Sequence, residues 1–484
     1  MSTQLAATYG TRPQGAWLTE RVWEPTVVPA LAATGLSYVT VDDYHFLCTG
    51  LTAEALDSHY TTEEGGVPLD LFPIAEGLRY RLPFAPAATA VAYLEELAKR
   101  GDRAAIYFDD IEKFGIWPET HSWVYVQGWL TQFIEGVLAS PHIATSTYAE
   151  FHSHSRSRGL IYLPTTSYSE MNEWTLPPPA ASRYRALVAA AQDQNRLTLD
   201  RPFLRGGIWR NFLSRYPEAN WMHKRMIEIS DRLAAHAESA ANADCRQLLY
   251  RAQANDAYWH GLFGGLYLPH LRRSIWRNLL TLETRLPPRV ASRKIDLDLD
   301  GVDEIILRSP DLLIALRDDG LSTLHEFSSF ALTHNFGDTL RRSTEHYFST
   351  IENAVATHAD HAMDAGIASA HERIAFKQVI DPANLTPDTA CRGLFMDARS
   401  AGAGYDAIDH YCLERIDAEI VETCASLATL DTQLHKTFRL QGADLIVSYH
   451  TAPARSCRML TRIHLALPSC DGFGGRYRLA DGTI

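Results

Sequence analysis

The chain has 484 residues, which is too long for one average domain and allows about three domains, or one large barrel with a second domain. Hydrophobic residues make up 46% of the chain and charged residues 21%, which is typical of globular proteins and argues against disorder. The 45 Lys and Arg residues stand against 58 Asp and Glu residues, so the formal charge is −13, which disfavours a general nucleic-acid binder.

The sequence contains no run of about 18 apolar residues, so it predicts no membrane span, and residues 1–17 have no signal-peptide core. The 7 cysteines are odd in number and form no CxxC pair, which indicates neither a zinc ribbon nor a disulfide framework. A reducing cytoplasm is therefore the expected location. The 10 Trp and 21 Tyr residues suit a sugar-binding cleft, although aromatic cores have a similar composition.

Residues 1–180 alternate short apolar runs with helical patterns. Such alternation predicts a parallel sheet with crossovers, and in these sheets and barrels the chemistry lies beyond the C-terminal ends of the strands. We expect helices over residues 25–33, 86–100 and 123–138, and strands over residues 37–41, 104–108 and 160–163.

Residues 181–289 are mostly helical in pattern, with helices expected over 182–195 and 221–257 and a linker at 284–289. Residues 290–484 instead contain short apolar runs separated by turns, which predicts an antiparallel β-sandwich. The expected strands are 295–299, 305–307, 312–316, 445–449 and 463–467.

The first segment that could carry chemistry is WLTERVWEP, residues 17–25, where Glu20 lies between two tryptophans just before a helix. Glu20 would lie where a barrel strand ends, as a carboxylate nucleophile flanked by sugar-stacking rings. The alternative is a surface glutamate paired with Arg21, with Trp17 and Trp23 in the core. On this segment alone, the alternative is the stronger interpretation.

The second segment is YFDDIEKFGIWP, residues 107–118, in which Asp109, Asp110 and Glu112 follow an expected strand. Acids at the C-terminal end of a strand point into the mouth of the sheet. Adjacent carboxylates also raise one another's pKa, which suits a general acid. The alternatives are a solvated loop or a cation site, and Lys113 could neutralise either arrangement.

The third segment, residues 252–267, places Asp256, Trp259 and His260 before small residues that let backbones approach closely. These side chains would contact a sugar, or they would form a tight helix junction, and the two interpretations are equal. Trp174 and Arg210 lie in two further segments, 165–177 and 205–211, that suit a cleft with a structural role as the equal alternative.

Two histidine pairs have the spacing of metal ligands. His152 with His154, and His358 with His361, both lack a third ligand that the sequence alone can place. We therefore expect solvated or loop histidines and no metal site.

Taken in order, WLTERVWEP, DDIEKFGIWP and NDAYWHGLFGGLYLPHLR resemble glycoside hydrolase family 57, and within it the 4-α-glucanotransferase and α-amylase-like branch. The resemblance spans most of the chain and includes EMNEWTLP, RGGIWRNFLSRYPEANWMHKRM and SCDGFGGRY. It implies an incomplete seven-stranded (β/α) barrel over residues 1–180, a helical region completing the catalytic cleft over 181–289, and a β-sandwich over 290–484.

Carried over residue by residue, the resemblance implies that Glu20 is the nucleophile and Asp110 the general acid/base. Glu20 would attack the anomeric carbon while Asp110 protonates the departing oxygen, and a sugar hydroxyl or water would then break the glycosyl-enzyme in a retaining reaction. No metal or organic cofactor is required. The substrate-binding residues would be Trp17, Trp117, Trp174 and Asp256 from the resemblance, together with the candidates Trp259, His260 and Arg210.

The family's first strand, with its His-Gln-Pro motif, precedes the nucleophile, whereas Glu20 lies near the start of this chain. We therefore expect a fragment shortened at both ends, with a sandwich that stops early at Ile484. The implied function is transfer of maltooligosaccharide segments between α-1,4-glucans. The alternatives are α-amylase-type hydrolysis and an inactive carbohydrate-binding fragment. The expected partners are α-1,4-glucans and a second copy in a homodimer, with no nucleic acid and no membrane.

Overall fold

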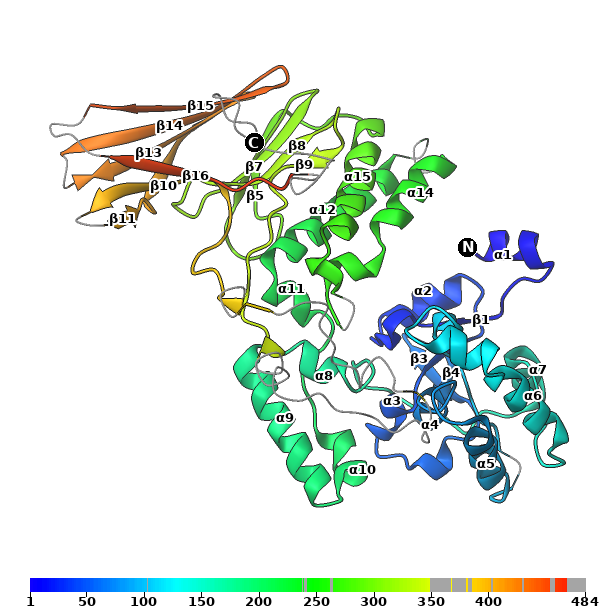
Figure 1. Cartoon of the computed structure of the whole chain (residues 1–484). Helices are drawn as coiled ribbons and strands as arrows, with labels where there is room; N and C mark the ends of the chain where they lie inside the picture. Colours follow the sequence, from blue (N-terminus) through cyan, green and yellow to red (C-terminus); the bar gives the residue numbers. More distant parts are fainter. Residues whose placement is uncertain are drawn as a thin grey trace. The chain divides into compact units, whose positions relative to one another are not determined.

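The computed structural model describes residues 1–101, 103–236, 238, 242–261, 264–348, 367, 380–381, 385–401, 404–428, 431–452 and 458–467 (Figure 1). The chain forms two compact units. The first contains Met1–Asn211 and Thr344–Leu385, and the second contains Phe212–Ser343 and Thr386–Ile484. The predicted three-part division at residues 180 and 289 stays a prediction.

The first unit contains a four-stranded sheet in the order β1-β2-β4-β3. Strand β2 pairs in parallel with β1 and β4, whereas β3 and β4 form an antiparallel hairpin. Gly65 and Gly66 close this hairpin with φ of 59° and 81°, the left-handed geometry of tight hairpin turns. The prediction of a parallel sheet is therefore wrong for β3, because this turn reverses the chain. The strands are β1 (Gly15–Trp17), β2 (Tyr38–Asp42), β3 (Tyr60–Glu64) and β4 (Val67–Ile74).

The core of this unit fixes the carboxyl ends of β1 and β2. Val39 and Val41 of β2, Leu71 of β4 and Val28 of α2 are fully buried in one cluster. The helices of the unit are α1 (Ser2–Tyr9), α2 (Val27–Ala33), α3 (Asp43–Leu47), α4 (Glu76–Arg79), α5 (Ala87–Ala98), α6 (Trp129–Ala139), α7 (Tyr148–His154), α8 (Met171–Trp174), α9 (Pro178–Asp193) and α10 (Leu197–Asp200). Helix α11 (Asn211–Arg215) begins at Asn211, the last residue of the segment Met1–Asn211.

Two predicted strands are wrong. Residues 104–108 are extended but form no ladder, because their backbone bonds go to two different segments: Ala104 N–H donates to the Asp57 carbonyl, and the Ile106 carbonyl accepts from Ala75. Residues 160–163 make only an isolated bridge from Leu160 to Thr61. The helix expected over 123–138 is interrupted at Gly128, which has φ of 79°, between a π-helical turn (Ser122–Val126) and α6.

The second unit begins with helices that lead into two antiparallel sheets. The helical pattern expected over 221–257 is not one continuous helix, because α12 ends at Ala235, His236 is not helical and helix α14 begins at Ala243. Asn242 caps that helix by accepting backbone N–H bonds from Asp244 and Cys245. The helices are α12 (Pro217–Ala235), α14 (Ala243–Ala252) and α15 (Pro269–Arg285).

The predicted antiparallel β-sandwich is confirmed. One sheet has the order β11-β10-β8-β7-β6-β5, with β9 and β16 paired at its side, and the other has the order β12-β13-β14-β15. Ile314 of β7 and Phe438 of β14 are fully buried in one core between the sheets. The strands are β5 (Ser292–Ile295), β6 (Glu304–Arg308), β7 (Leu312–Arg317), β8 (Leu324–Ser329), β9 (His334–Asn335), β10 (Leu394–Ala401), β11 (Gly404–Ala407), β12 (Tyr411–Ile416), β13 (Ile420–Leu427), β14 (Thr432–Gln441), β15 (Asp444–Thr451) and β16 (Met459–Ile463).

Two strand predictions in the sandwich are displaced. The run 295–299 folds as a loop after Ile295, because Asp296 accepts the backbone N–H groups of Asp300 and Gly301 and so replaces ladder bonds. The strand expected over 463–467 ends at Ile463 instead.

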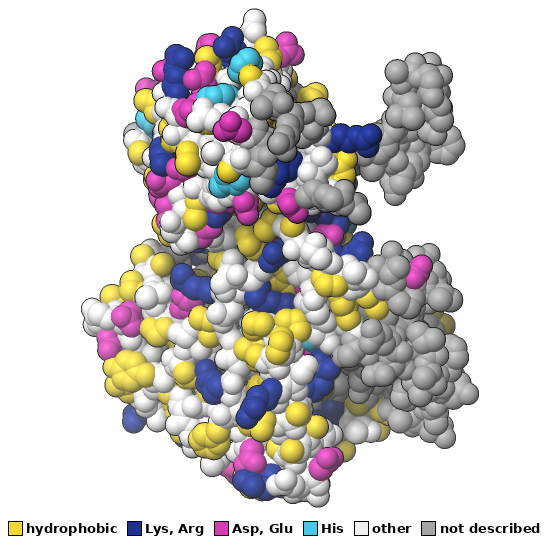
Figure 2. All heavy atoms as spheres, turned by 90° about the vertical axis from the view of Figure 1, so that its left-hand side faces the viewer, with side chains coloured by type: hydrophobic (Ala, Val, Ile, Leu, Met, Phe, Trp, Pro, Cys, Tyr) yellow, Lys and Arg dark blue, Asp and Glu magenta, His cyan; other side chains and the backbone are white. Residues whose placement is uncertain are grey.

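The face shown in Figure 2 carries both signs of charge, with Lys and Arg side chains and Asp and Glu side chains interspersed among hydrophobic ones. Within the described ranges, no helix combines the length and the apolar character that a membrane crossing requires.

Candidate active site

Glu20 lies just beyond β1 in a short helical turn, Thr19–Arg21. Glu20 and Arg21 have φ of 51° and 47°, a left-handed conformation that side-chain-bearing residues rarely adopt. Two buried neighbours hold this backbone: Ser167 Oγ donates to the Glu20 carbonyl oxygen, and His45 Nε2 lies 2.8 Å from the Arg21 carbonyl oxygen. These two contacts hold the strained backbone of the turn that carries Glu20.

The Glu20 carboxylate is hydrogen-bonded to Tyr168. Burial, and then the charge of Glu20 and this hydrogen bond, raise the pKa of Tyr168 well above its usual range, so the phenol keeps its proton and donates it. The Arg21 guanidinium stacks 4.2 Å from the centroid of the Tyr168 ring. Arg21 itself forms an ion pair with Asp42, with 3.4 Å between Nε and Oδ1. The alternative of core tryptophans is right for Trp23, which is 1% exposed.

A chain of buried ion pairs connects the Glu20 segment with the Asp110 segment. From Asp42, which pairs with Arg21, the chain continues through Arg79, whose guanidinium lies 3.2 Å from both Asp42 and Asp109. Lys113 Nζ completes the chain by donating to Asp109. All five side chains are at most 10% exposed. Charges this deeply buried are stable only when paired, so each residue fixes the next.

The two adjacent aspartates differ in their partners. Asp109 accepts from Arg79 and Lys113, and also from the Asp110 backbone N–H at 2.9 Å, so its role is anchoring. Burial, and then the negative charge of Asp109, raise the pKa of Asp110, and Arg21 partly opposes this rise. A carboxyl that keeps its proton to higher pH is suited to general-acid catalysis, which favours Asp110 for that role.

Three predicted stacking residues lie in the first unit and are partly exposed. The Trp17 ring contacts Phe108, just before the aspartates, at 5.2 Å between centroids. Trp174 lies edge-on to Tyr168 at 5.7 Å, and so next to the partner of Glu20. Trp117 stacks on Phe84 at 5.9 Å, and the Lys113 ammonium lies 5.8 Å from its ring. The fold therefore places one tryptophan beside each part of the site.

Arg210 forms a two-pronged ion pair with Glu24, with both N–O distances 2.6 Å. This pair ties the segment RGGIWRN to the segment that carries Glu20. The structure therefore gives Arg210 a structural contact, and its predicted substrate-binding role stays a prediction.

Asp256, Trp259 and His260 lie in the second unit. Burial raises the pKa of Asp256. Trp259 and His260 are 6% and 2% exposed, the indole N–H donates to Asn255, and His260 Nε2 lies 2.7 Å from the Tyr216 hydroxyl. These contacts are those of a tight helix junction, and contact of these three residues with sugar stays a prediction.

Sequence reasoning missed Arg79 and His45 and placed Tyr168 only in a weak segment. Arg79 reaches Asp42 and Asp109 across 37 and 30 positions, so no local pattern could reveal it. For Tyr168, one feature of the sequence indicated a role in the site, which was its position among the polar residues of segment 165–177. The pair His358 and His361, residues 262–263 of the third segment and SCDGFGGRY at 469–477 lie outside the described residues.

A glutamate beyond a parallel strand, an aspartate with a raised pKa beyond an extended segment and partly exposed tryptophans near both are features that a carbohydrate-active site would need. Three family models match the chain: glycosyl hydrolase family 57 over residues 2–164, and the middle and C-terminal domains of alpha-amylase/4-alpha-glucanotransferase over 207–286 and 296–484.

Relatives agree with these matches. A 4-alpha-glucanotransferase of Thermococcus litoralis is 41% identical over 77% of this chain and 55% of its own length. An alpha-amylase of Pyrococcus abyssi is 42% identical over 74% of this chain and 53% of its own length. The crystal structure of 4-alpha-glucanotransferase from Thermococcus litoralis superposes with a TM-score of 0.83 and 33% identity, covering 96% of this chain and 71% of that one.

The chain belongs to glycoside hydrolase family 57. It spans about half the length of the curated relatives it matches.

Proposed function

We propose that this chain is a retaining enzyme acting on α-1,4-glucans, and specifically a 4-α-glucanotransferase. Glu20 attacks the anomeric carbon, and Asp110 donates its proton to the departing glycosidic oxygen. In the second half of the reaction Asp110 takes a proton from the 4-hydroxyl of an acceptor glucan, which then displaces Glu20. Maltooligosaccharide segments thereby move from one chain to another.

The observation that supports this proposal most directly is the different environment of the two carboxyls. Tyr168 donates a hydrogen bond to Glu20, as expected beside a carboxylate nucleophile. Burial and Asp109 instead favour the protonated form of Asp110, as a general acid requires. A carboxylate that accepts a hydrogen bond, together with a second carboxyl whose pKa is raised, fits the nucleophile and the acid/base of retaining glycosidases.

The test is incubation of the full chain with maltoheptaose, with products separated by length. We expect products both longer and shorter than the substrate. Glu20→Gln should abolish them, and Asp110→Asn should slow them by about 10²–10⁴-fold. Glu96→Gln, an exposed carboxylate on α5 paired with Lys99, is the matched control and should be as active as the wild type.

The alternative function is hydrolysis, which the α-amylase relatives of equal identity favour. Products that are only shorter than maltoheptaose would replace transferase with hydrolase while leaving the two catalytic roles intact. Saturable maltoheptaose binding with no turnover would instead support a carbohydrate-binding protein. A cytoplasmic location, from the odd cysteine count, and a homodimer, from the family resemblance, belong to the same proposal.

A further inference from the structure

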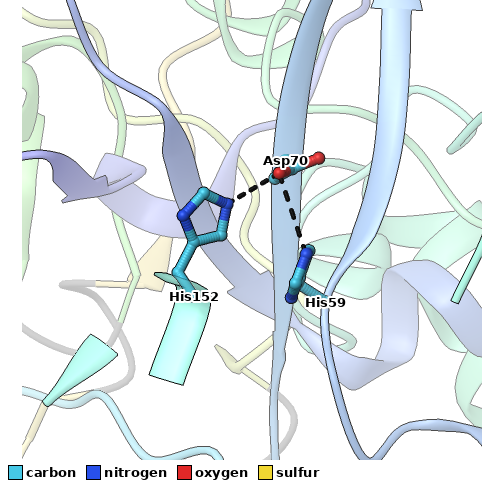
Figure 3. Close-up of side chains that lie close together, drawn as sticks. All are labelled: His59, Asp70 and His152. Atoms are coloured by element: carbon cyan, nitrogen blue, oxygen red, sulfur yellow. Dashed lines mark hydrogen bonds and ion pairs between the residues drawn. The ribbon is translucent and has the colours of Figure 1, made fainter. Parts of the chain in front are cut away.

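The fold brings His152 close to two possible metal ligands, His59 and Asp70, that are distant from it in the sequence. His152 lies on α7, His59 directly precedes β3, and Asp70 lies on β4. The three side chains converge (Figure 3), and one ligand atom from each lies within 4.8 Å of the other two. Two imidazoles and one carboxylate are a donor set that zinc and related divalent transition metals prefer.

The spacing of the ligand atoms suits a tetrahedral ion. Asp70 Oδ2 lies 2.7 Å from His152 Nε2 and 3.8 Å from His59 Nε2. Around a tetrahedral zinc with bonds of about 2.0–2.1 Å, neighbouring ligand atoms are about 3.3 Å apart. The two observed distances bracket this value, so shifts of a few tenths of an ångström would admit the ion.

The outer atoms of two of these ligands are already held. Thr61 Oγ1 donates to Asp70 Oδ1 at 2.6 Å, which leaves Oδ2 facing the histidines. Ser155 Oγ lies 3.3 Å from His59 Nδ1, which leaves Nε2 facing the carboxylate. Metal-binding histidines and carboxylates are typically oriented by such outer hydrogen bonds.

The cluster of His59, Asp70 and His152 is also accessible from solvent on one side. The His59 side chain is 4% exposed, whereas those of Asp70 and His152 are 21% and 20% exposed. One ligand is therefore anchored in the core, and the other two reach solvent. Solvent would supply a water molecule as the fourth ligand.

We propose that His59, Asp70 and His152 form a binding site for a divalent transition-metal ion of the zinc class. The ion would clamp α7 to β4. Helix α7 also carries Tyr148, whose hydroxyl donates to the Tyr107 carbonyl at 2.9 Å, just before the aspartates of the candidate active site. The clamp would therefore stabilise the segment that leads to those aspartates, and it is independent of which glucan reaction the chain performs.

The test is titration of the metal-free full chain with Zn²⁺ by calorimetry, and with Co²⁺ by visible absorption. We expect one equivalent of tight binding, a higher melting temperature with Zn²⁺, and the visible bands of tetrahedral Co²⁺ without a thiolate charge-transfer band. His152→Ala should lose this binding by at least tenfold. His154→Ala, on the same helix and exposed, is the matched control and should bind as the wild type does.

Asp70→Asn keeps the shape of the ligand and its bond from Thr61, so it tests the site if His152→Ala is misfolded by circular dichroism. Loss of binding in Asp70→Asn supports the site. Binding that survives both variants would overturn it, and so would equal loss in His154→Ala. A thiolate band would also overturn it, because it would place the ion at the other group that includes Cys424.

Discussion

At the scale of single residues, the proton affinity of Asp110 depends on its charged neighbours. Burial and Asp109 raise its pKa, Arg21 and Arg79 lower it, and Glu112 raises it further. Asp109 and Arg79 cannot be changed without breaking buried ion pairs. Glu112 is the neighbour that can be changed with least effect on the fold.

Glu112→Gln should therefore move the alkaline limb of the activity profile to lower pH. The negative charge of Glu112 disfavours ionisation of Asp110, so its removal lowers the pKa of Asp110. At a given alkaline pH, less of the acid form then remains to protonate the leaving oxygen. The measurement is the pH dependence of kcat/KM on maltoheptaose, with Glu96→Gln as the control. A limb that stays in place or moves to higher pH would contradict the role of Asp110 as general acid.

At the scale of elements, the segment 252–267 contains a glycine, Gly265, that allows two parts of the backbone to approach closely. Gly265 has φ of 46°, and a Cβ there would lie 2.0 Å from the Trp259 carbonyl oxygen and 2.9 Å from that of Asp256. The prediction that small residues allow close backbone approach is confirmed at this position. The segment Asn255–Tyr258 and the following helical turn, Gly265–Tyr267, pack together only because the side chain is absent.

Gly265→Ala should destabilise the second unit by about 2–4 kcal/mol, because strain at positive φ adds to a backbone clash that no side-chain movement relieves. Gly301→Ala is the matched control: it also has positive φ, 90°, but nothing lies within 4 Å of its Cβ, so it should cost about 1 kcal/mol. Urea unfolding followed by fluorescence measures both. If both variants lost the same unfolding free energy, the strain of positive φ alone, and not the backbone clash, would explain why position 265 needs glycine.

Helices were more predictable than strands for a physical reason. Helix α5 follows Pro86, and Gly101 lies just past its end, so local sequence marks both ends. The expected strand 104–108 depended on partners elsewhere in the chain, and those partners offered only single backbone bonds. The candidate site divides in the same way. Glu20 and Asp110 could be chosen from motif resemblance, whereas the ion pair of Arg79 with Asp42 could be known only from the fold.

At the scale of the whole molecule, the helices after residue 212 and the sandwich belong to one compact unit. Arg225 of α12 shows why. Its guanidinium binds Glu283 of α15 at 2.7 Å, Glu326 of β8 at 3.0 Å and Glu228 at 2.6 Å. Burial alone would raise the pKa of Glu283, but Arg225 and Arg232 lower it to about 2. One fully buried cation therefore joins two helices to the sheet.

Arg225→Met should destabilise the second unit by about 3–5 kcal/mol, because it leaves buried carboxylates without their shared cation. Glu228 keeps Arg293 and Glu283 keeps Arg232, so the largest loss falls on Glu326. Arg277→Met, on the exposed face of α15, should change stability by no more than about 0.5 kcal/mol. Urea unfolding of both variants at neutral pH is the measurement. If Arg225→Met were as stable as the wild type, hydrophobic packing between the helices and the sandwich, rather than this cluster, would account for the single unit.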